Sequence, residues 1–183
     1  MSTDVPHQLT FQQRKAAAQF HALDTNGNGY LERDGYDAIV DRVLAEFSVD
    51  PGSPSARNLR QQYLTLFDRL LERMDRDGDG RISEAEFLAS VGASVTKSHG
   101  KAMRPVAHAV FTNADRDHDD HLSAEEFRRL LAVMDAPMDE EAIEQVLVDG
   151  RLNREGFAQL IEGYYGSPDA SAPGSRLFGP VRS

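Results

Sequence analysis

The residues with the clearest chemistry lie in segment 75–86, where carboxylates occupy alternating positions. Aspartates stand at its first, third and fifth positions, Gly80 at its sixth and Glu86 at its twelfth. This spacing is the D-x-[DN]-x-[DN]-G-x5-E pattern of a calcium-binding loop. Calcium takes six to eight oxygen ligands, which the pattern supplies from carboxylates, a backbone carbonyl and a bidentate glutamate. The predicted ligands of this segment, loop 2, are Asp75, Asp77, Asp79, the backbone carbonyl of Arg81, and Glu86.

Segment 115–126, loop 3, repeats the pattern with one departure. Asp120 stands at its sixth position, where glycine is usual because the backbone turns there with a positive φ. Aspartate tolerates positive φ better than most other non-glycine residues, so we expect the loop to keep its shape. The predicted ligands of loop 3 are Asp115, Asp117, Asp119, the backbone carbonyl of His121, and Glu126.

Segment 24–35, loop 1, follows the pattern only in part. Gly35 stands at its twelfth position, so the bidentate carboxylate is missing, and two amides replace carboxylates. We expect calcium to bind weakly here or not at all, and the alternative role of the segment is to pair with loop 2. The candidate ligands are Asp24, Asn26, Asn28, the backbone carbonyl of Tyr30, and Glu32.

The chain repeats a second signal, an apolar residue followed five positions later by an aromatic one. In an EF-hand, these are the strand residue at loop position 8 and the first residue of the exiting helix. The fourth copy follows a loop that is about four residues short, with Gly156 in place of the closing glutamate. We therefore expect the fourth hand to bind no calcium but to fold against the third. The four pairs are Leu31/Tyr36, Ile82/Phe87, Leu122/Phe127 and Leu152/Phe157.

Apolar residues at helical spacing flank these loops and predict the elements that position them. We predict an all-α fold of four EF-hand helix-loop-helix units in two pairs, packed as a compact globule with short two-stranded β pairings between loops. The first pair would span residues 1–97, the second residues 98–166, and an irregular tail residues 167–183. The segment 97–101 reads as a connector between the pairs, and Pro105 as a residue of the first turn of the next helix.

Some features of this prediction are local. Ser53 and Pro54 are expected to begin a helix, and Ser83 with Glu86 forms a capping box.

The tail is either a disordered end or a plug that docks on the body through Leu177 and its neighbour Phe178.

Composition narrows the function classes. The net charge of −10 suits a cation binder and argues against nucleic acid or an anionic membrane as a partner. The chain has no cysteine, so thiolate metal sites and disulfides are excluded, and its histidines lack the spacing of a transition-metal site. The sequence contains neither a nucleophile elbow nor a phosphate-binding loop, so we do not expect an enzyme. With no signal-peptide pattern and no apolar run of membrane-spanning length, we expect the protein in the cytoplasm. We also expect a monomer.

The whole chain resembles the bacterial calerythrin-like proteins, which are similar to sarcoplasmic calcium-binding proteins. The resemblance rests on four hands, on a longer spacing from Asp24 to Asp75 than from Asp75 to Asp115, and on the tail segment 172–179. It implies a compact globule with packed hand pairs, which buffers calcium or, in some members, signals.

Two functions remain open at this point. A calcium buffer or store folds compactly around its ions, whereas a calcium sensor opens a methionine-rich groove for a target protein. The chain has only 5 methionines, which favours the buffer. We expect two tightly bound calcium ions, at loops 2 and 3, and a third at loop 1 that is weak or absent. Magnesium would be the competing ion.

Overall fold

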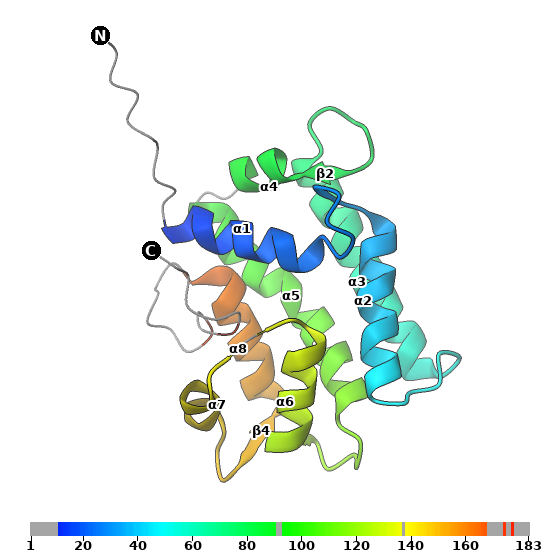
Figure 1. Cartoon of the computed structure of the whole chain (residues 1–183), viewed down its shortest axis with the longest axis vertical. Helices are drawn as coiled ribbons and strands as arrows, with labels where there is room; N and C mark the ends of the chain where they lie inside the picture. Colours follow the sequence, from blue (N-terminus) through cyan, green and yellow to red (C-terminus); the bar gives the residue numbers. More distant parts are fainter. Residues whose placement is uncertain (1–10, 91–92, 137, 168–173, 175–176, 178–183) are drawn as a thin grey trace.

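Helices and short strands alternate in the order expected for four helix-loop-helix units (Figure 1). The computed structural model describes residues 11–90, 93–136, 138–167, 174 and 177. The elements of the first half are α1 (Phe11–Leu23), β1 (Tyr30–Leu31), α2 (Arg33–Glu46), α3 (Pro54–Met74), β2 (Ile82–Ser83) and α4 (Glu84–Ser90). Those of the second half are α5 (Ala93–Ala114), β3 (His121–Ser123), α6 (Ala124–Val133), α7 (Glu140–Val146), β4 (Arg151–Asn153) and α8 (Arg154–Gly166).

The short strands pair the hands two by two. Strand β1 runs antiparallel to β2, with Leu31 opposite Ile82, and β3 runs antiparallel to β4, with Leu122 opposite Leu152. All four of these residues occupy the predicted loop position 8, and all are buried. The predicted pairing of the first hand with the second, and of the third with the fourth, is therefore confirmed.

The aromatic residues that follow the loops lie in a core shared by both pairs. Tyr36, Phe87, Phe127 and Phe157 are buried and belong to one hydrophobic cluster. The Phe87 ring lies 5.7 Å from that of Phe20, centroid to centroid. Burial of an aromatic or large aliphatic side chain contributes about 1.5–3 kcal/mol, so these contacts hold the all-α fold together. The predicted fold class is confirmed.

Local capping signals begin the helices where they were predicted. The Ser53 hydroxyl accepts a hydrogen bond from the backbone N–H of Ala56 at 3.1 Å, with Pro54 as the first residue of α3. The Ser83–Glu86 capping box is present at the start of α4. These contacts satisfy backbone N–H groups that have no partner inside the helix.

The predicted connector at 97–101 is wrong, because α5 runs without a break from Ala93 to Ala114. Gly100 lies inside this helix, where it allows a close approach to α8. A Cβ atom on it would stand 2.6 Å from the backbone oxygen of Glu162. Pro105 is likewise in the interior of α5 and not in a first turn. Assignment of residues 1–97 and 98–166 to separate domains stays a prediction.

Two tail residues are described, and both contact the body. A Cβ atom on Gly174 would stand 2.5 Å from the backbone oxygen of Leu160, so the tail backbone lies directly on α8. Leu177 is 1% exposed. At these positions the tail docks as a plug, whereas Phe178 lies outside the described residues. Within the described part of the chain, no helix has the length and apolar character needed to cross a membrane.

Candidate metal centres

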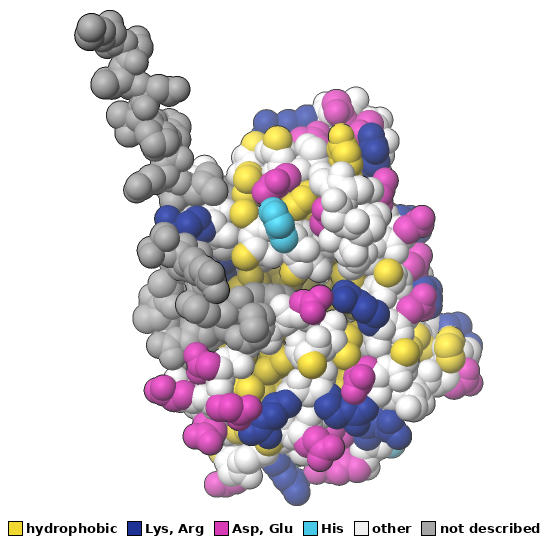
Figure 2. All heavy atoms as spheres, viewed as in Figure 1, with side chains coloured by type: hydrophobic (Ala, Val, Ile, Leu, Met, Phe, Trp, Pro, Cys, Tyr) yellow, Lys and Arg dark blue, Asp and Glu magenta, His cyan; other side chains and the backbone are white. Residues whose placement is uncertain are grey.

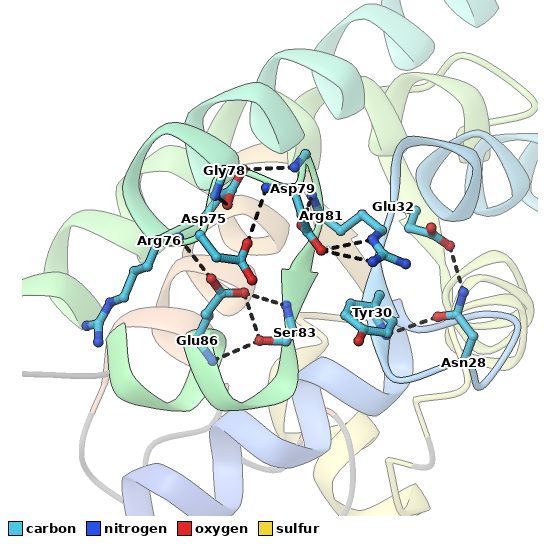
Figure 3. Close-up of polar contacts among 12 residues, drawn as sticks. Asn28, Tyr30, Glu32, Asp75, Arg76, Gly78, Asp79, Arg81, Ser83 and Glu86 are labelled. Atoms are coloured by element: carbon cyan, nitrogen blue, oxygen red, sulfur yellow. Dashed lines mark hydrogen bonds and ion pairs between the residues drawn. The ribbon is translucent and has the colours of Figure 1, made fainter.

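Loop 2 folds its aspartates inward by donating backbone hydrogen bonds to them (Figure 3). The Asp75 carboxylate accepts N–H groups from Gly78 at 2.7 Å and from Gly80 at 3.1 Å. Both glycines have positive φ, 74° and 80°, which a side chain would strain. Asp75, Asp77 and Glu86 each place one oxygen within 4.8 Å of the others. The structure thus brings together three of the predicted ligands of this loop.

Glu86 closes loop 2 from the first turn of α4. One carboxylate oxygen accepts the backbone N–H of Arg76 at 2.8 Å, and the other accepts the N–H and hydroxyl of Ser83. These hydrogen bonds, with that from Arg76 the strongest, lower the pKa of Glu86 to about 2. The side chain is therefore ionised at neutral pH, as a bidentate calcium ligand must be.

The fifth-position carboxylate of loop 2 has an arginine partner. Asp79 accepts the backbone N–H of Arg81 at 2.8 Å and also its guanidinium, at 2.9 and 3.2 Å. That guanidinium lies over the Tyr30 ring, 4.1 Å from its centroid (Figure 3). Arg81 was predicted only as a backbone ligand. Its side chain also places a positive charge beside the site and joins loop 2 to loop 1.

Loop 3 has the same plan in a more buried setting. Asp115 is 4% exposed, and burial raises its pKa. Its Oδ2 accepts the N–H of Asp120 at 3.1 Å, while its buried Oδ1 has no hydrogen-bond partner among the described residues. Asp115, Asp117 and Glu126 place one oxygen each within 4.8 Å of the others. Asp120 adopts the expected positive φ of 62°, so the missing glycine does not disrupt the loop.

The fourth hand supports loop 3 with arginines. Arg151, on β4, donates to Asp119 Oδ2 at 2.9 Å, and Arg154 donates to Asp120 at 2.9 Å. His121 contributes its backbone to the loop, since its N–H donates to Asp119 Oδ1 at 2.9 Å. Sequence analysis missed both arginines because they lie more than 30 residues from the carboxylates they contact.

Loop 1 has the shape of a calcium loop but fewer carboxylates at its ligand positions. Asp24 accepts the N–H of Gly29 at 2.9 Å, and Asn28 accepts that of Tyr30 at 2.9 Å. The Asn28 amide donates to Glu32 at 2.7 Å (Figure 3). Asn26 accepts the N–H of Asn28 at 3.1 Å. Among the described residues, the groups of three acids lie in loops 2 and 3 and not here.

The fourth loop is a tight hairpin. Val148 and Arg151 form an isolated antiparallel bridge, and between them Asp149 and Gly150 have positive φ of 52° and 76°. An Asp-Gly pair with two positive φ values is the type I′ turn of a two-residue hairpin. This compact turn connects α7 directly to β4. It leaves no encircling segment that could carry a set of calcium ligands.

The donors in loops 2 and 3 fit a hard cation. The two groups of acids consist of carboxylates alone, and calcium and magnesium prefer oxygen ligands. Buried carboxylates are costly unless they are paired or coordinate a metal. Asp115 is such a buried carboxylate, and its Oδ1, which has no hydrogen-bond partner among the described residues, is free to coordinate a metal.

Comparisons with known proteins agree with this geometry. A family model described as EF hand matches residues 16–34, 67–91 and 107–131, which contain the first three hands in whole or in part. Calerythrin from Saccharopolyspora erythraea is 25% identical over 138 residues, covering 72% of this chain and 78% of its own. The structure of a Streptomyces coelicolor calcium-binding protein superposes with a TM-score of 0.75 at 27% identity, covering 86% and 99% of the two chains.

The sarcoplasmic calcium-binding protein from amphioxus shares the fold. It has a TM-score of 0.69 at 18% identity and covers 94% of this chain and 98% of its own. The chain therefore contains EF-hand units and is similar to calerythrin and to a calcium-binding protein of Streptomyces coelicolor, and it shares the fold of a sarcoplasmic calcium-binding protein.

Proposed function

We propose that this protein buffers or stores calcium in the cytoplasm as a monomer, with its two tight sites in loops 2 and 3. The observation that carries the proposal is the pair of carboxylate groups, Asp75 with Asp77 and Glu86, and the corresponding group of loop 3. In the loop 2 site, the remaining predicted ligands are Asp79 and the backbone carbonyl of Arg81. In the loop 3 site, they are Asp119 and the backbone carbonyl of His121. The absence of cysteine suits a reducing compartment.

The shared core supports a buffer. Apolar residues of both pairs are buried against one another, and Leu177 of the tail belongs to the same cluster. Among the described residues, Val148 is the one exposed large hydrophobic residue, at 75%. A sensor must present an apolar groove larger than the few hundred Å² usual for a monomer. A buffer needs no such surface.

Calcium would act on this fold through charge. Carboxylates gathered within 4.8 Å repel one another, and a cation removes that repulsion. Because only the folded loop assembles the ligands, binding stabilises the fold by about 2.7 kcal/mol at a calcium concentration 100 times Kd. The net charge of −10 also attracts divalent cations to the protein.

The alternative is a calcium sensor with a protein target. An apolar cavity of about 50 Å³ lies between the pairs, with Leu23, Ile39, Met103 and Met134 among its lining residues. Figure 2 shows apolar side chains across the middle of this face, between the levels of α1 and α6. If calcium widened this cavity, it would become a groove. The Streptomyces coelicolor relative is described as acting in calcium-mediated regulation, which supports the sensor as the alternative.

Calorimetric titration of decalcified protein tests the proposal. We expect two tight events at micromolar affinity or better, and a third, if present, that is much weaker. Magnesium at millimolar concentration should compete measurably. Four equal sites, or no binding, would contradict the assignment.

A hydrophobic-probe dye separates buffer from sensor. Full-length protein should bind less dye with calcium than without, because the ion consolidates the core. A chain ending at Gly166 serves as the control and should bind more dye than the full chain, since it lacks Leu177. A strong calcium-induced rise in the full chain would favour the sensor.

A further inference from the structure

The end of α2 exposes two carbonyl groups that its own backbone does not satisfy. Ser48, with φ of 50°, ends the helix: its N–H donates to Ala45 O, and that of Val49 donates to Leu44 O at 2.8 Å. This is the Schellman pattern, which satisfies the carbonyls of the last turn from within the chain. The carbonyls of Glu46 and Phe47 remain for other donors.

Both carbonyls accept hydrogen bonds from arginines of the third hand. Arg129 donates to the Glu46 carbonyl at 2.6 Å and to the Glu46 carboxylate at 2.7 Å. Arg116 donates to the Phe47 carbonyl at 2.5 Å. The Arg129 guanidinium also lies 5.1 Å from the centroid of the Phe47 ring. Positive charge at a helix C-terminus is favourable because it opposes the helix dipole. We name Arg116 and Arg129 the arginine clamp.

The clamp is built on the calcium loop itself. Arg116 is the second residue of loop 3, and its backbone N–H donates to the Glu126 carboxylate at 2.9 Å. Arg129 follows Glu126 by three residues on α6, which places it one helical turn away. Glu126 is the predicted closing ligand of loop 3. Glu126 thus connects the predicted calcium site to both arginines, to Arg116 through its carboxylate and to Arg129 through the first turn of α6.

The clamp spans the two halves of the chain. Arg129 and Glu46 are 83 residues apart, and Arg116 and Phe47 are 69 apart. A further ion pair, Arg42 to Asp135 at 3.4 Å, joins α2 to the residues just after α6. Since Arg42 precedes Glu46 while Asp135 follows Arg129, α2 and α6 run antiparallel at this contact.

We propose that calcium bound in loop 3 tightens the arginine clamp and thereby orders the end of α2 in the other hand pair. A cation held by Glu126 restrains the backbones of both arginines, so their guanidinium groups lose less entropy on docking. The coupling is reciprocal: if calcium strengthens the clamp, the clamp strengthens calcium binding by the same factor. This inference rests on the proposed calcium function of loop 3. The N-terminal pair would then respond to an ion that it does not bind.

Hydrogen exchange of segment 46–49 tests the coupling in a chain whose loop 2 is silenced by Glu86→Gln. With calcium in loop 3 alone, we expect exchange of the Phe47, Ser48 and Val49 amides to slow by about fivefold, a typical coupling factor. Adding Arg129→Met should abolish this slowing and weaken loop 3 binding by the same factor. Arg128→Met is the matched control. It removes the adjacent guanidinium of α6, which pairs with Glu140 at 2.8 Å, and should change neither quantity.

Each outcome is decisive. One bound ion without slower exchange at 46–49 would overturn the coupling and leave the calcium function standing. Absence of any calcium binding in the Glu86→Gln chain would overturn both. Equal effects of Arg129→Met and Arg128→Met would show a general loss of positive charge and would also overturn the clamp. If Arg129→Met does not fold, Arg116→Met takes its place and should abolish the same slowing.

Discussion

Loops 2 and 3 have the same predicted ligand types, yet they lie in different surroundings. The first aspartate of loop 3, Asp115, is buried with an unpartnered oxygen, whereas Asp75 of loop 2 is half-buried and accepts two N–H groups. The fifth-position carboxylate is paired within its own loop by Arg81 in one case and by the fourth hand's Arg151 in the other. The motif therefore specifies the predicted ligands, whereas burial and the nearest arginine, from the same loop or from the neighbouring hand, set their electrostatics.

Removing the closing carboxylate should have the largest effect. Glu126→Gln is expected to weaken binding at loop 3 by about 100-fold, or about 2.7 kcal/mol, because an amide cannot act as a bidentate anion. Glu86→Gln should likewise abolish the event at loop 2. Calorimetry checks both variants, with Glu125→Gln, an exposed neighbour, as the control. Retention of two tight events in either variant would refute the ligand assignment.

Gly35→Glu should add what loop 1 lacks. A Cβ atom on Gly35 would stand 3.4 Å from Thr25 Oγ1, an ordinary contact, so the side chain can be accommodated. We expect calcium binding at loop 1 to strengthen by about tenfold, or about 1.4 kcal/mol. Gly35→Gln is the control for size without charge. An unchanged titration would mean that the Asn28–Glu32 contact, and not the missing carboxylate, limits this loop.

The two calcium loops should respond to pH with opposite sign in decalcified protein. The pKa of Glu86 is lowered from its usual 4.5, so the ionised side chain stabilises the fold at pH values above 4.5. This stabilisation is lost as the pH falls towards about 2. The raised pKa of Asp115 destabilises the fold at neutral pH and is relieved as the carboxyl is protonated. Asp115→Asn should therefore raise the melting temperature at pH 7 by about 2–4 °C, whereas Glu86→Gln should lower it.

Thermal unfolding in chelator from pH 7 to pH 2 measures these differences. The difference in melting temperature between each variant and the wild type should shrink as the pH falls, because each wild-type carboxyl becomes neutral like its amide replacement. A melting temperature that falls for Asp115→Asn at pH 7 would contradict the cost assigned to this buried carboxylate.

Removing the arginines beside the loops should have the smallest effect. Arg151→Gln and Arg81→Gln each remove a positive charge near a predicted calcium ligand and should tighten binding at loops 3 and 2, respectively. The expected gain is about two- to fivefold, since partly exposed charge pairs contribute about 0.2–1 kcal/mol. Arg128→Gln, which removes a guanidinium that pairs with Glu140 and not with a loop carboxylate, is the control. Weaker binding in the variants would mean that these arginines position the carboxylates more than they repel the ion.

Hand pairing was accessible to sequence analysis because it repeats a short pattern. The position-8 residues, such as Leu122 and Leu152, were identified by an aromatic five residues later, and the strands pair as predicted. The long helix α5 was not recognised, because Gly100 and Pro105 are usually signals of a loop or a helix start. Their true setting depends on α8, whose backbone approaches Gly100 too closely for any side chain.

The sequence by itself determined the two calcium loops and the helix caps, because each depends on residues within about twelve positions of one another. Tertiary structure alone decided which distant charges meet loop 3 and the end of α2. Arg151 contacts Asp119 across 32 residues, and Arg129 contacts Glu46 across 83. No local spacing records such a contact, since it exists only once the hands have packed around a common core. The predicted ligands are thus a local property of the chain, whereas these long-range charge pairs are a property of the fold.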